Sequence, residues 1–511
     1  MRKRQLILTY DIGTTGNKCT IFDETGTVVG AVIEPYNTYY PRPGWSEQDP
    51  EDFVKSVVDG TKKILNQYEI LPEDIAVIGL SGHMNGCLPV DKEGRVLFNN
   101  IIHSDARTGK QCEDILAKFD PMEVYNITGN RIDPHYTLPK ILWLKENYPD
   151  IYKNSAYFLN TKDYISYWLT GNLGITDLSD ASLTCMLDIK KGIWAREFIK
   201  ELGIDINKLP RLCRSHDMAG GLSKKAADVL GLKEGTPVVV GGGDGACATK
   251  GAGVMDTGLA YNYIGSSSWI STLNDGPVLD KEARIFNFYD LDGIHCNVTG
   301  TVQCATISYD WVKDNIGLYE KELAERNKQS VFEIIQQMAE KSPIGSNGVF
   351  FLPYLMGERT PHWDKNTRGA FIGFTLFHGR EDLFRSVYEG IAYALRSVLD
   401  VFEENGLEVE KLTLIGGGAK SPLWNEIMCN VYRKPLAIHS SPGEATSMGA
   451  AIAAGVGVGI FKDYKDAAKA VKYKRELTPE PHQVEEYKKY YKIYKMMYPQ
   501  LKPVYEAISY L

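Results

Sequence analysis

The sequence predicts an α/β protein of two domains. Its 511 residues are enough for two to four domains at roughly 150 residues each. Helical and strand patterns alternate along the chain, which is typical of helices layered on sheets. A strand–turn–strand pattern opens the chain and occurs again from residue 259. This repetition indicates two related halves.

The first half opens with a β-meander. Apolar segments separated by turns of Gly, Thr and Asp predict strands over residues 5–10, 18–22 and 28–33. An amphipathic pattern then predicts a helix over 52–68, and an apolar run predicts a strand over 76–80. Helix and strand thus follow each other, as an α/β layer requires.

The second half repeats the opening. Strands are expected over 259–264 and 269–273, on either side of the polar turn Gly265–Ser268. Glycine and aspartate interrupt the pattern just before, at residues 253–258. We therefore expect domains of 1–255 and 256–511.

The C-terminal segment predicts a helix over 483–498. Tyrosines recur there at helical spacing with lysines between them, at positions 487, 491, 494 and 498. We expect the tyrosines to dock on the protein body while the lysines face water. The alternative is a surface for single-stranded nucleic acid, against which the net charge of -8 argues.

Composition favours a cytoplasmic protein. Nine cysteines are scattered without a Cys-x-x-Cys pair, which fits a reducing compartment. The chain starts with basic residues, but its apolar run Leu6–Leu8 is shorter than the roughly 7–15 residues of a signal-peptide core. The apolar stretch 449–461 is shorter than the roughly 20 residues of a membrane span. We interpret it as a buried helix and expect no membrane partner.

Residues 11–16 form the first candidate site. A strand delivers the Asp11 carboxylate to a turn that contains Thr14 and Thr15. Hydroxyls and turn N–H groups can donate to phosphate oxygens, and glycine allows a close approach of the backbone. A carboxylate beside phosphates can hold Mg²⁺. An ordinary hairpin turn remains the alternative for this motif alone.

The second candidate is Asp244, which follows a strand over 236–240 and three glycines. A carboxylate at such a crowded strand end can take a proton from a substrate hydroxyl as a general base. The glycine spacing also matches a dinucleotide-binding fingerprint. That fingerprint needs an acid at the end of a second strand roughly 20 residues on, whereas Asp256 lies nearer and in a turn.

Two further glycine turns complete the pattern. Residues 416–421 join a strand over 412–415 to a helix that begins near Leu423, and such a turn can seat an adenosine against the backbone. Residues 265–267 are a second candidate phosphate turn. Two phosphate hairpins, an acid between them and a late glycine turn occur in the order typical of the sugar kinase/Hsp70/actin superfamily, with its actin-like ATPase (ribonuclease H-like) fold.

The sequence resembles the FGGY carbohydrate kinases over nearly its whole length. Residues 137–147 resemble the first signature of that family, and residues 369–374 with 382–389 resemble the second. Within the family the resemblance is nearest to the xylulokinases, through residues 45–50, 351–355 and 357–362. Residues 444–459 also resemble the autoinducer-2 kinases.

The resemblance implies a role for each motif. Asp244 would be the catalytic base in contact with the sugar, and Asp11 would lie near Mg²⁺ and phosphate. The nucleotide ATP would contact the following residues: Thr14, Thr15, Gly265, Ser266, Ser267, Trp311, Gly417, Gly418 and Ala419. Relatives are often dimers, so a homodimer is one expected assembly.

The sugar-binding residues are expected to be Met84, Asn85, Asp105 and Asp244. Here the sequence departs from the xylulokinases, which typically carry Met-His at 84–85, Trp-Asn-Asp at 103–105 and a larger polar residue at Gly245. We expect ATP-dependent phosphorylation of D-xylulose to D-xylulose 5-phosphate. The alternatives are another ketose, polyol, sugar acid or autoinducer-2-like substrate, and a non-catalytic sugar-binding regulator.

Overall fold

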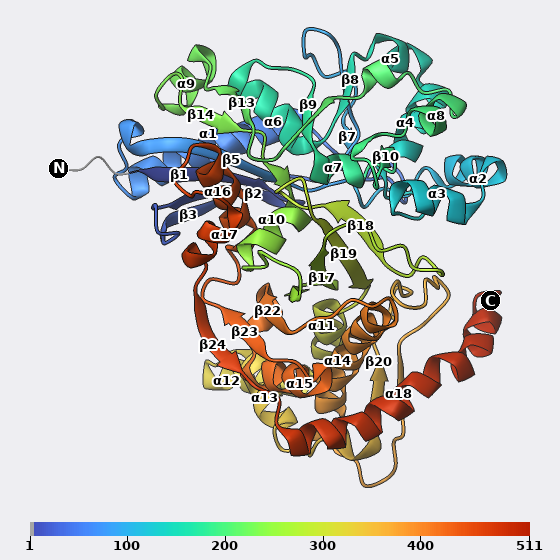
Figure 1. Cartoon of the computed structure of the whole chain (residues 1–511). Coiled ribbons are helices and arrows are strands. Elements are labelled where there is room, and N and C mark those ends of the chain that lie inside the picture. Colours follow the sequence, from blue (N-terminus) through green and yellow to red (C-terminus); the bar gives the residue numbers. More distant parts are fainter. Residues whose placement is uncertain (1–4) are drawn as a thin grey trace.

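Two mixed β-sheets form the frame of the protein (Figure 1). The computed structural model describes residues 5–511, so the basic start at residues 1–4 lies outside it. The first sheet has the strand order β13-β14-β5-β1-β2-β3, and β15 also pairs with β5. Its strands are β1 (Leu6–Ile12), β2 (Gly16–Phe22), β3 (Val28–Pro35), β5 (Ile75–Gly82), β13 (Met218–Gly221), β14 (Pro237–Val239) and β15 (Gly242–Gly243).

The second sheet repeats the central pattern of the first. Its order is β18-β19-β17-β16-β22-β23-β24. The hairpin β16–β17 is antiparallel and β16 runs parallel to β22, just as β1 pairs antiparallel with β2 and parallel with β5. Its strands are β16 (Leu259–Ile264), β17 (Ser268–Asn274), β18 (Phe286–Tyr289), β19 (Cys296–Val302), β22 (Lys411–Ile415), β23 (Leu436–His439) and β24 (Tyr473–Leu477).

The predicted strands of both openings are present, and the first is longer than expected. We expected it to end at residue 10, but β1 continues to Ile12 because Asp11 pairs with Lys18 on β2 and with Ser81 on β5. Pairing on both sides therefore keeps Asp11 within the sheet. The expected helix over 52–68 is α1 (Pro50–Gln67), which the Asp49 side chain caps by accepting the Glu51 N–H.

Three helices position the site. The helix α10 (Asp244–Gly251) follows β15, and α16 (Ala445–Gly457) crosses back from the late sequence to pack on α10, β1 and β5. The long helix α14 (Arg380–Glu404) packs in the second domain against α15 (Pro422–Tyr432) and α13 (Val331–Ala339). The predicted buried helix at 449–461 overlaps α16, but α16 begins earlier and ends at Gly457, and it covers the sheet of the first half.

The remaining elements cover the two sheets or form small ribbons. The helices are α2 (Gly109–Lys118), α3 (Pro121–Thr128), α4 (Thr137–Asn147), α5 (Pro149–Asn154), α6 (Thr161–Thr170), α7 (Leu178–Ser182), α8 (Arg196–Glu201), α9 (Lys224–Leu230), α11 (Thr306–Asn315), α12 (Leu318–Asn327), α17 (Tyr464–Ala467) and α18 (Pro481–Ile508). The short strands are β4 (Glu47–Gln48), β6 (Leu88–Val90), β7 (Asn100–Ile101), β8 (Tyr157–Leu159), β9 (Ile175–Asp177), β10 (Leu187–Asp188), β11 (Ile193–Trp194), β12 (Arg211–Cys213), β20 (Phe350–Leu352) and β21 (Ala370–Ile372).

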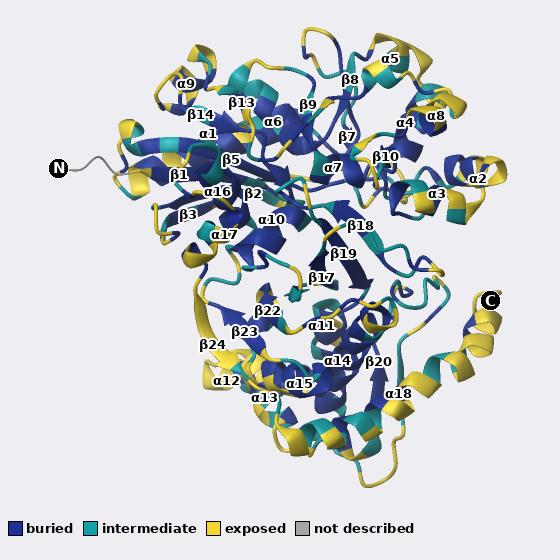
Figure 2. Ribbon diagram, viewed as in Figure 1, coloured by how far each residue is buried: buried dark blue, intermediate teal, exposed yellow. Residues whose placement is uncertain are grey.

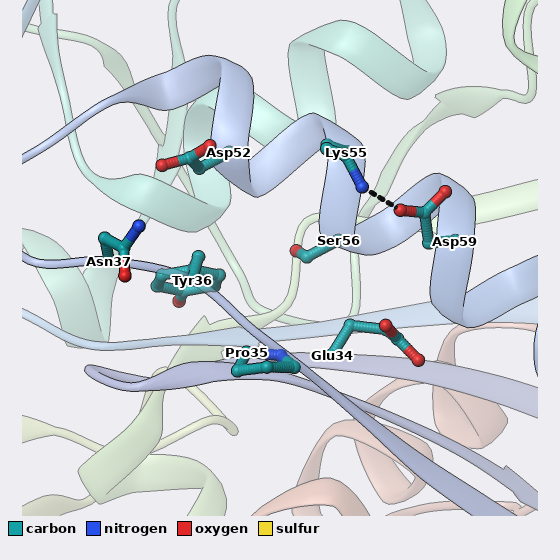
Figure 3. Close-up of a pocket in the computed structure, with 8 residues that line it drawn as sticks. All are labelled: Glu34, Pro35, Tyr36, Asn37, Asp52, Lys55, Ser56 and Asp59. Atoms are coloured by element: carbon teal, nitrogen blue, oxygen red, sulfur yellow. Dashed lines mark hydrogen bonds and ion pairs between the residues drawn. The ribbon is translucent and has the colours of Figure 1, made fainter.

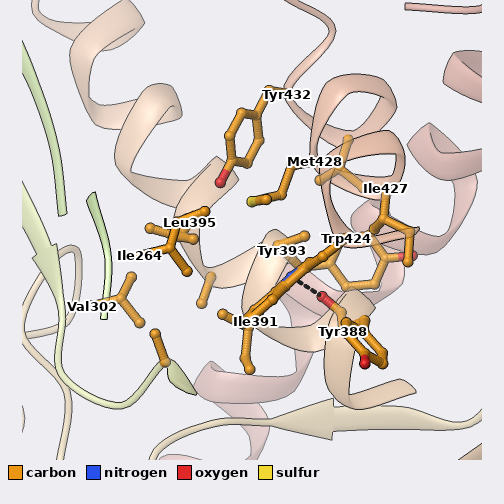
Figure 4. Close-up of a cluster of buried hydrophobic side chains, with 14 of the residues drawn as sticks. Ile264, Val302, Tyr388, Ile391, Tyr393, Leu395, Trp424, Ile427, Met428 and Tyr432 are labelled. Carbon is orange, nitrogen blue, oxygen red and sulfur yellow. Dashed lines mark hydrogen bonds between the residues drawn. The ribbon is translucent and has the colours of Figure 1, made fainter. Parts of the chain in front are cut away.

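The cores lie on both sides of the inter-domain region. Figure 2 shows dark blue, buried residues in the strands of both sheets and in α10 and α14. In the second domain, aromatic and branched side chains of α14 and α15 interlock around Trp424, whose indole N–H donates to the Tyr388 carbonyl at 3.1 Å (Figure 4). A buried indole keeps a partner in this way.

The C-terminal helix docks through its tyrosines. Tyr487, Tyr491 and Tyr494 are buried in the core of the second domain, and Tyr498 is partly buried. Tyr491 also donates to Asp400 of α14 at 2.8 Å. The lysines at 489, 492 and 495 are exposed. The aromatic rings therefore face the protein and are not presented to a nucleic acid.

Candidate active site

The first sheet brings three predicted segments to one edge. Asp11 on β1 pairs with Ser81 on β5, and Ser81 pairs with Gly242 on β15. These three strands run parallel where they pair, so their carboxyl ends meet at the same edge. Asp244 begins α10 directly after β15. The two acids of the sequence prediction therefore lie at the ends of strands that belong to one parallel set.

Asp244 has the environment of a base. It is partly buried and stands at the first position of α10. Gly241, which starts the turn before it, has a φ of 75°, a backbone conformation that glycine adopts without strain. Burial and the charge of Asp11 raise the pKa of the Asp244 carboxyl to about 7. A carboxylate with a raised proton affinity is a better acceptor of a hydroxyl proton near neutral pH.

Asp11 stands between a cation and an anion. Burial raises the pKa of its carboxyl, and the Lys18 ammonium acts against this effect. Lys18 also lies 3.5 Å from Glu444 and donates to the Gly443 carbonyl. Glu444 and Gly443 directly precede α16, so the returning helix closes this side of the site.

The first hairpin turn is held by a hydrogen bond from Tyr36. Thr14 is partly buried and Thr15 is exposed. The Tyr36 hydroxyl donates to the Gly13 carbonyl. Tyr36 also lines a pocket of about 270 Å³ between β3 and α1, which Figure 3 shows with its acidic residues. None of the predicted site residues lines that pocket. The pocket therefore lies outside the candidate site, and Tyr36 is the residue that contacts both the pocket and the turn.

The second hairpin turn contacts the start of α11. The Gly265 carbonyl accepts the Thr306 N–H at 2.9 Å, and the Ser266 carbonyl accepts the Ala305 N–H at 2.8 Å. Ser266 is exposed and Ser267 is partly buried. Trp311 lies on the same helix, with 44% of its surface exposed. The structure thus brings Trp311 and the turn at 265–267 into one part of the second domain.

The late glycine turn lies beside this second hairpin. Tyr263 on β16 pairs with Ile415 on β22, so both strands end next to each other. A side chain on Gly418 would come within 2.3 Å of Ile264, which places the turn directly on the end of β16. Gly417 is exposed, Gly418 partly buried and Ala419 buried.

Met84 lies next to the glycine turn before Asp244, and Asn85 follows Met84 in the chain. The Met84 side chain packs on Gly243, where an added Cβ would be 2.6 Å from its thioether. Asn85 has a φ of 65°, and its carbonyl accepts a hydrogen bond from the buried Lys140 ammonium at 2.6 Å. The Asn85 Oδ1 is buried and has no hydrogen-bond partner within residues 5–511. A buried acceptor of this kind favours a ligand that donates to it.

Asp105 is saturated by protein donors. It is fully buried, accepts the Ser46 N–H at 2.6 Å and pairs with the Arg107 guanidinium at 2.7 Å. That guanidinium stacks on Trp45, with 3.8 Å to the ring centroid. In this structure Asp105 therefore fixes Arg107 and the Trp45 segment, and its contact with a sugar stays a prediction.

Family models match both halves of the chain. The N-terminal domain model of the FGGY family of carbohydrate kinases matches residues 6–251, and the C-terminal domain model matches residues 260–458. The chain belongs to the FGGY family of carbohydrate kinases. The family assignment, the two-domain actin-like fold and the kinase class expected from the sequence are thereby confirmed.

Individual FGGY relatives carry two different names. A xylulose kinase of Bacillus subtilis is 32% identical over 507 residues, with 98% of each chain covered. A gluconokinase of the same organism is 31% identical and covers 87% of this chain and 86% of its own. The crystal structure of a ligand-bound xylulose kinase from Lactobacillus acidophilus superimposes with a TM-score of 0.90 at 25% identity, covering 99% of this chain and 100% of its own.

The structure adds site residues of this FGGY kinase that sequence reasoning missed. His83 is buried beside Met84 and contacts Gln48 at 3.1 Å and Thr161 at 2.9 Å. The His103 ring lies 5.7 Å from the His83 ring. Burial lowers the pKa of His83 to about 4 and that of His103 to about 3. The adjacency of His83 to the predicted pair at 84–85 was the available signal.

A residue of the second domain lies near His103. Burial and the charges of His83 and Lys140 lower the pKa of His103, and the Arg359 guanidinium adds a smaller effect in the same direction. Its neighbour Glu358 is buried, and burial raises the pKa of that carboxyl to about 8. Residues 357–362 had been noted only for their resemblance to xylulokinases. Their position at the domain boundary could not be seen without the fold.

The position of Gly245 explains one departure from the xylulokinases. A Cβ on Gly245 would come within 3.2 Å of the Phe288 ring and 3.7 Å of the Met84 sulfur. Phe288, on β18 of the second sheet, therefore lies where a side chain at position 245 would begin. The wall beside Asp244 is apolar as a result.

Asp11 is the candidate residue for Mg²⁺. Its carboxylate lies near the end of β1, beside the first hairpin turn, and Mg²⁺ typically binds one or two carboxylates together with phosphate oxygens and waters. In the part of the chain that the structure describes, no group of three or more His, Cys, Asp or Glu side chains could hold a metal ion.

Within residues 5–511, no helix is long and apolar enough to cross a membrane.

Proposed function

We propose that this kinase transfers the γ-phosphate of ATP to the terminal hydroxyl of D-xylulose, with Asp244 as the general base. The observation that carries the proposal is the position of Asp244 on a glycine turn beside Asp11 and Met84, with its pKa raised to about 7. The relatives named xylulose kinase support the choice of sugar. The nine cysteines are unpaired thiols, which supports a reducing, cytoplasmic location.

Each group then has a defined task. Asp244 accepts the proton of the attacking hydroxyl. The unpartnered Asn85 Oδ1 accepts a hydrogen bond from another hydroxyl of the sugar. Thr14, Thr15 and the turn at 265–267 hold phosphates, while the turn at 417–419 and Trp311 hold the nucleoside. Asp11 would hold Mg²⁺, which would supply charge neutralisation at the phosphates. Positioning and charge neutralisation supply most of the rate in phosphoryl transfer.

A sugar acid is the second candidate substrate. The gluconokinase relative is nearly as similar as the xylulose kinase. Arg359 also lies near His103, and a guanidinium is well suited to bind a carboxylate. The neutral ketose is favoured because the wall formed by Phe288 and Met84 beside Asp244 is apolar.

The deciding experiment measures ADP release with ATP and Mg²⁺ against D-xylulose, D-ribulose, D-gluconate and glycerol. We expect the highest kcat/KM with D-xylulose. A higher kcat/KM with D-gluconate would establish the sugar-acid alternative. Binding of a sugar without any ADP release would instead support a non-catalytic regulator.

A further inference from the structure

A buried polar network lies beneath the glycine turn that carries Asp244. Its centre is Asp177, at the end of β9 and the N-cap of α7. One oxygen of Asp177, Oδ2, accepts the Ser179 N–H at 2.9 Å, the Ser179 hydroxyl at 2.5 Å and the Ser215 hydroxyl at 2.8 Å. The other oxygen, Oδ1, lies 2.9 Å from the Lys162 ammonium. All these residues are buried.

Ser179 connects this network to the turn. Its hydroxyl donates to Asp177 and accepts the Gly243 N–H at 2.9 Å. Gly243 is the N-cap of α10, and Asp244 follows it directly. A hydroxyl can donate once and accept at the same time. Ser179 is therefore hydrogen-bonded both to Asp177 and to the backbone N–H of Gly243, which precedes Asp244.

The turn needs such an anchor because it consists of three glycines. Glycine has the largest conformational freedom of all residues, so a glycine turn has no intrinsic rigidity. Backbone bonds hold its first residue, since the Gly241 N–H donates to the Ser215 carbonyl at 2.9 Å. Strand pairing with β5 holds Gly242 and Gly243 from one side, and the Ser179 hydroxyl holds Gly243 from the other.

Lys162 is the cation of the network. It lies 2.6 Å from Asp163, 2.9 Å from Asp177 and 3.1 Å from Asp180. Although burial opposes its charge, these three residues raise the pKa of Lys162 well above its usual value. A backbone N–H can only donate, so the Ser179 oxygen accepts from Gly243. The single proton of the Ser179 hydroxyl then points to Asp177 Oδ2.

We propose that Ser179, held by Asp177, is a positioning residue that fixes the Gly243–Asp244 backbone for proton transfer. Ser179 contacts no reacting atom, so its effect acts through Asp244. The proposal rests on the proposed role of Asp244 as the base. It predicts that removal of the Ser179 hydroxyl lowers turnover and leaves substrate binding almost unchanged, because the sugar and ATP are held by other residues.

The test compares Ser179→Ala with Ser215→Ala. Both variants remove one buried hydroxyl bound to the same Asp177 oxygen, but only Ser179→Ala removes the acceptor of the Gly243 N–H. We expect Ser179→Ala to lower kcat about tenfold, within the range that a misplaced catalytic group costs. The KM values for sugar and ATP should change less than about twofold, because Ser179 takes part in neither binding site. Ser179→Thr keeps the hydroxyl and should retain most of kcat.

Hydrogen exchange gives a second readout. The peptide that contains Gly243 should exchange faster in Ser179→Ala than in the unmodified enzyme, and Ser215→Ala should leave it unchanged. Equal kcat values for the two alanine variants, or loss of kcat in Ser179→Thr to the level of Ser179→Ala, would overturn the positioning role. Asp244→Asn is measured alongside: if it retains activity the role of the base itself fails, whatever Ser179 does.

Discussion

At Asp244, burial and the neighbouring Asp11 carboxylate both raise the pKa of the side chain. Both penalise the ionised form, so the pKa of Asp244 rises to about 7, close to the pH at which a cellular kinase works. The same groups that make Asp244 costly to ionise therefore make it an effective proton acceptor.

Replacement of Asp244 by asparagine should abolish phosphorylation of the sugar. The amide has nearly the same size but cannot accept the hydroxyl proton, and general-base catalysis contributes roughly 10²–10⁴-fold to rate. We expect kcat to fall by at least about 10²-fold at saturating sugar, with an unchanged melting temperature. Turnover near that of the unmodified enzyme would show that another group acts as the base.

Replacement of Asn85 by histidine should change the preference among sugars. Asparagine offers a donor and an acceptor on a short side chain, whereas histidine offers one of each on a wider ring. Both residue types tolerate the left-handed backbone found at Asn85. We expect relative kcat/KM values to shift toward D-xylulose among the pentuloses.

The KM for ATP provides the internal control for Asn85→His. It should barely change, because the turn proposed to hold the nucleoside follows β22 of the second sheet and Asn85 belongs to none of the proposed phosphate turns. The Asn85 Oδ1 accepts no hydrogen bond within the described residues, so it does not cap its turn as an acceptor. A variant that loses stability while keeping the same ranking of sugars would nevertheless show a structural role alone.

At the level of elements, the helices α10 and α16 join the two halves of the sequence. They cross so closely that a Cβ on Gly449 would come within 1.8 Å of the Cys247 carbonyl, and one on Gly251 within 1.7 Å of the Ala445 carbonyl. Glycines therefore allow backbone-to-backbone contact between the helix that begins with Asp244 and the helix that follows Glu444. The position of the base depends on this crossing.

Replacement of Gly449 by alanine should separate these helices. The added methyl group has no space, and overpacking of a tight core typically costs about 1–3 kcal/mol. We expect the free energy of unfolding in urea to fall by that amount and kcat to fall with it, because α10 shifts.

Gly109→Ala is a suitable comparison for Gly449→Ala. Gly109 begins α2, and no atom lies within 4 Å of its added Cβ. This variant should unfold like the original protein. If both variants have the same free energy of unfolding, the close packing of the helices at Gly449 does not contribute to the stability of the protein.

For the whole molecule, buried neutral histidines link stability to pH. Burial and the charge of Lys140 lower the pKa of His83 to about 4, whereas the unfolded chain has a pKa of about 6.5. Below pH 6.5 the unfolded state takes up a proton that the folded state does not. Stability is therefore fully present above pH 6.5 and is lost as the pH falls toward 4.

Urea unfolding at pH 6.5 and pH 5 should show this loss. His83 alone accounts for about 2 kcal/mol over this interval, because each pH unit between the two pKa values contributes about 1.4 kcal/mol. His83→Gln should reduce the difference between the two pH values by that amount. His482→Gln, on the exposed start of α18, should leave the difference unchanged. Equal pH dependence in all three proteins would contradict the neutral, buried state of His83.

The sequence by itself determined the local units of this protein. The strand–turn–strand openings, the glycine turns before Asp244 and after residue 415, and the helix over 52–68 could be predicted because each depends on neighbouring residues. Alternation of apolar residues predicts a strand, and a left-handed or crowded turn needs glycine. The kinase family could be recognised for the same reason, since its motifs are short segments of this kind.

Only the tertiary structure decided how distant segments meet. The return of α16 to the first sheet, the burial of Asp105 under Arg107 and the bond from Ser179 to Gly243 join residues far apart in the chain. No local pattern marks such contacts, because a buried polar group takes whichever partner the packed layers bring within hydrogen-bond distance. The residues that hold the Asp244 turn were for this reason invisible in the sequence, while Asp244 itself, the proposed base on its glycine turn, was not.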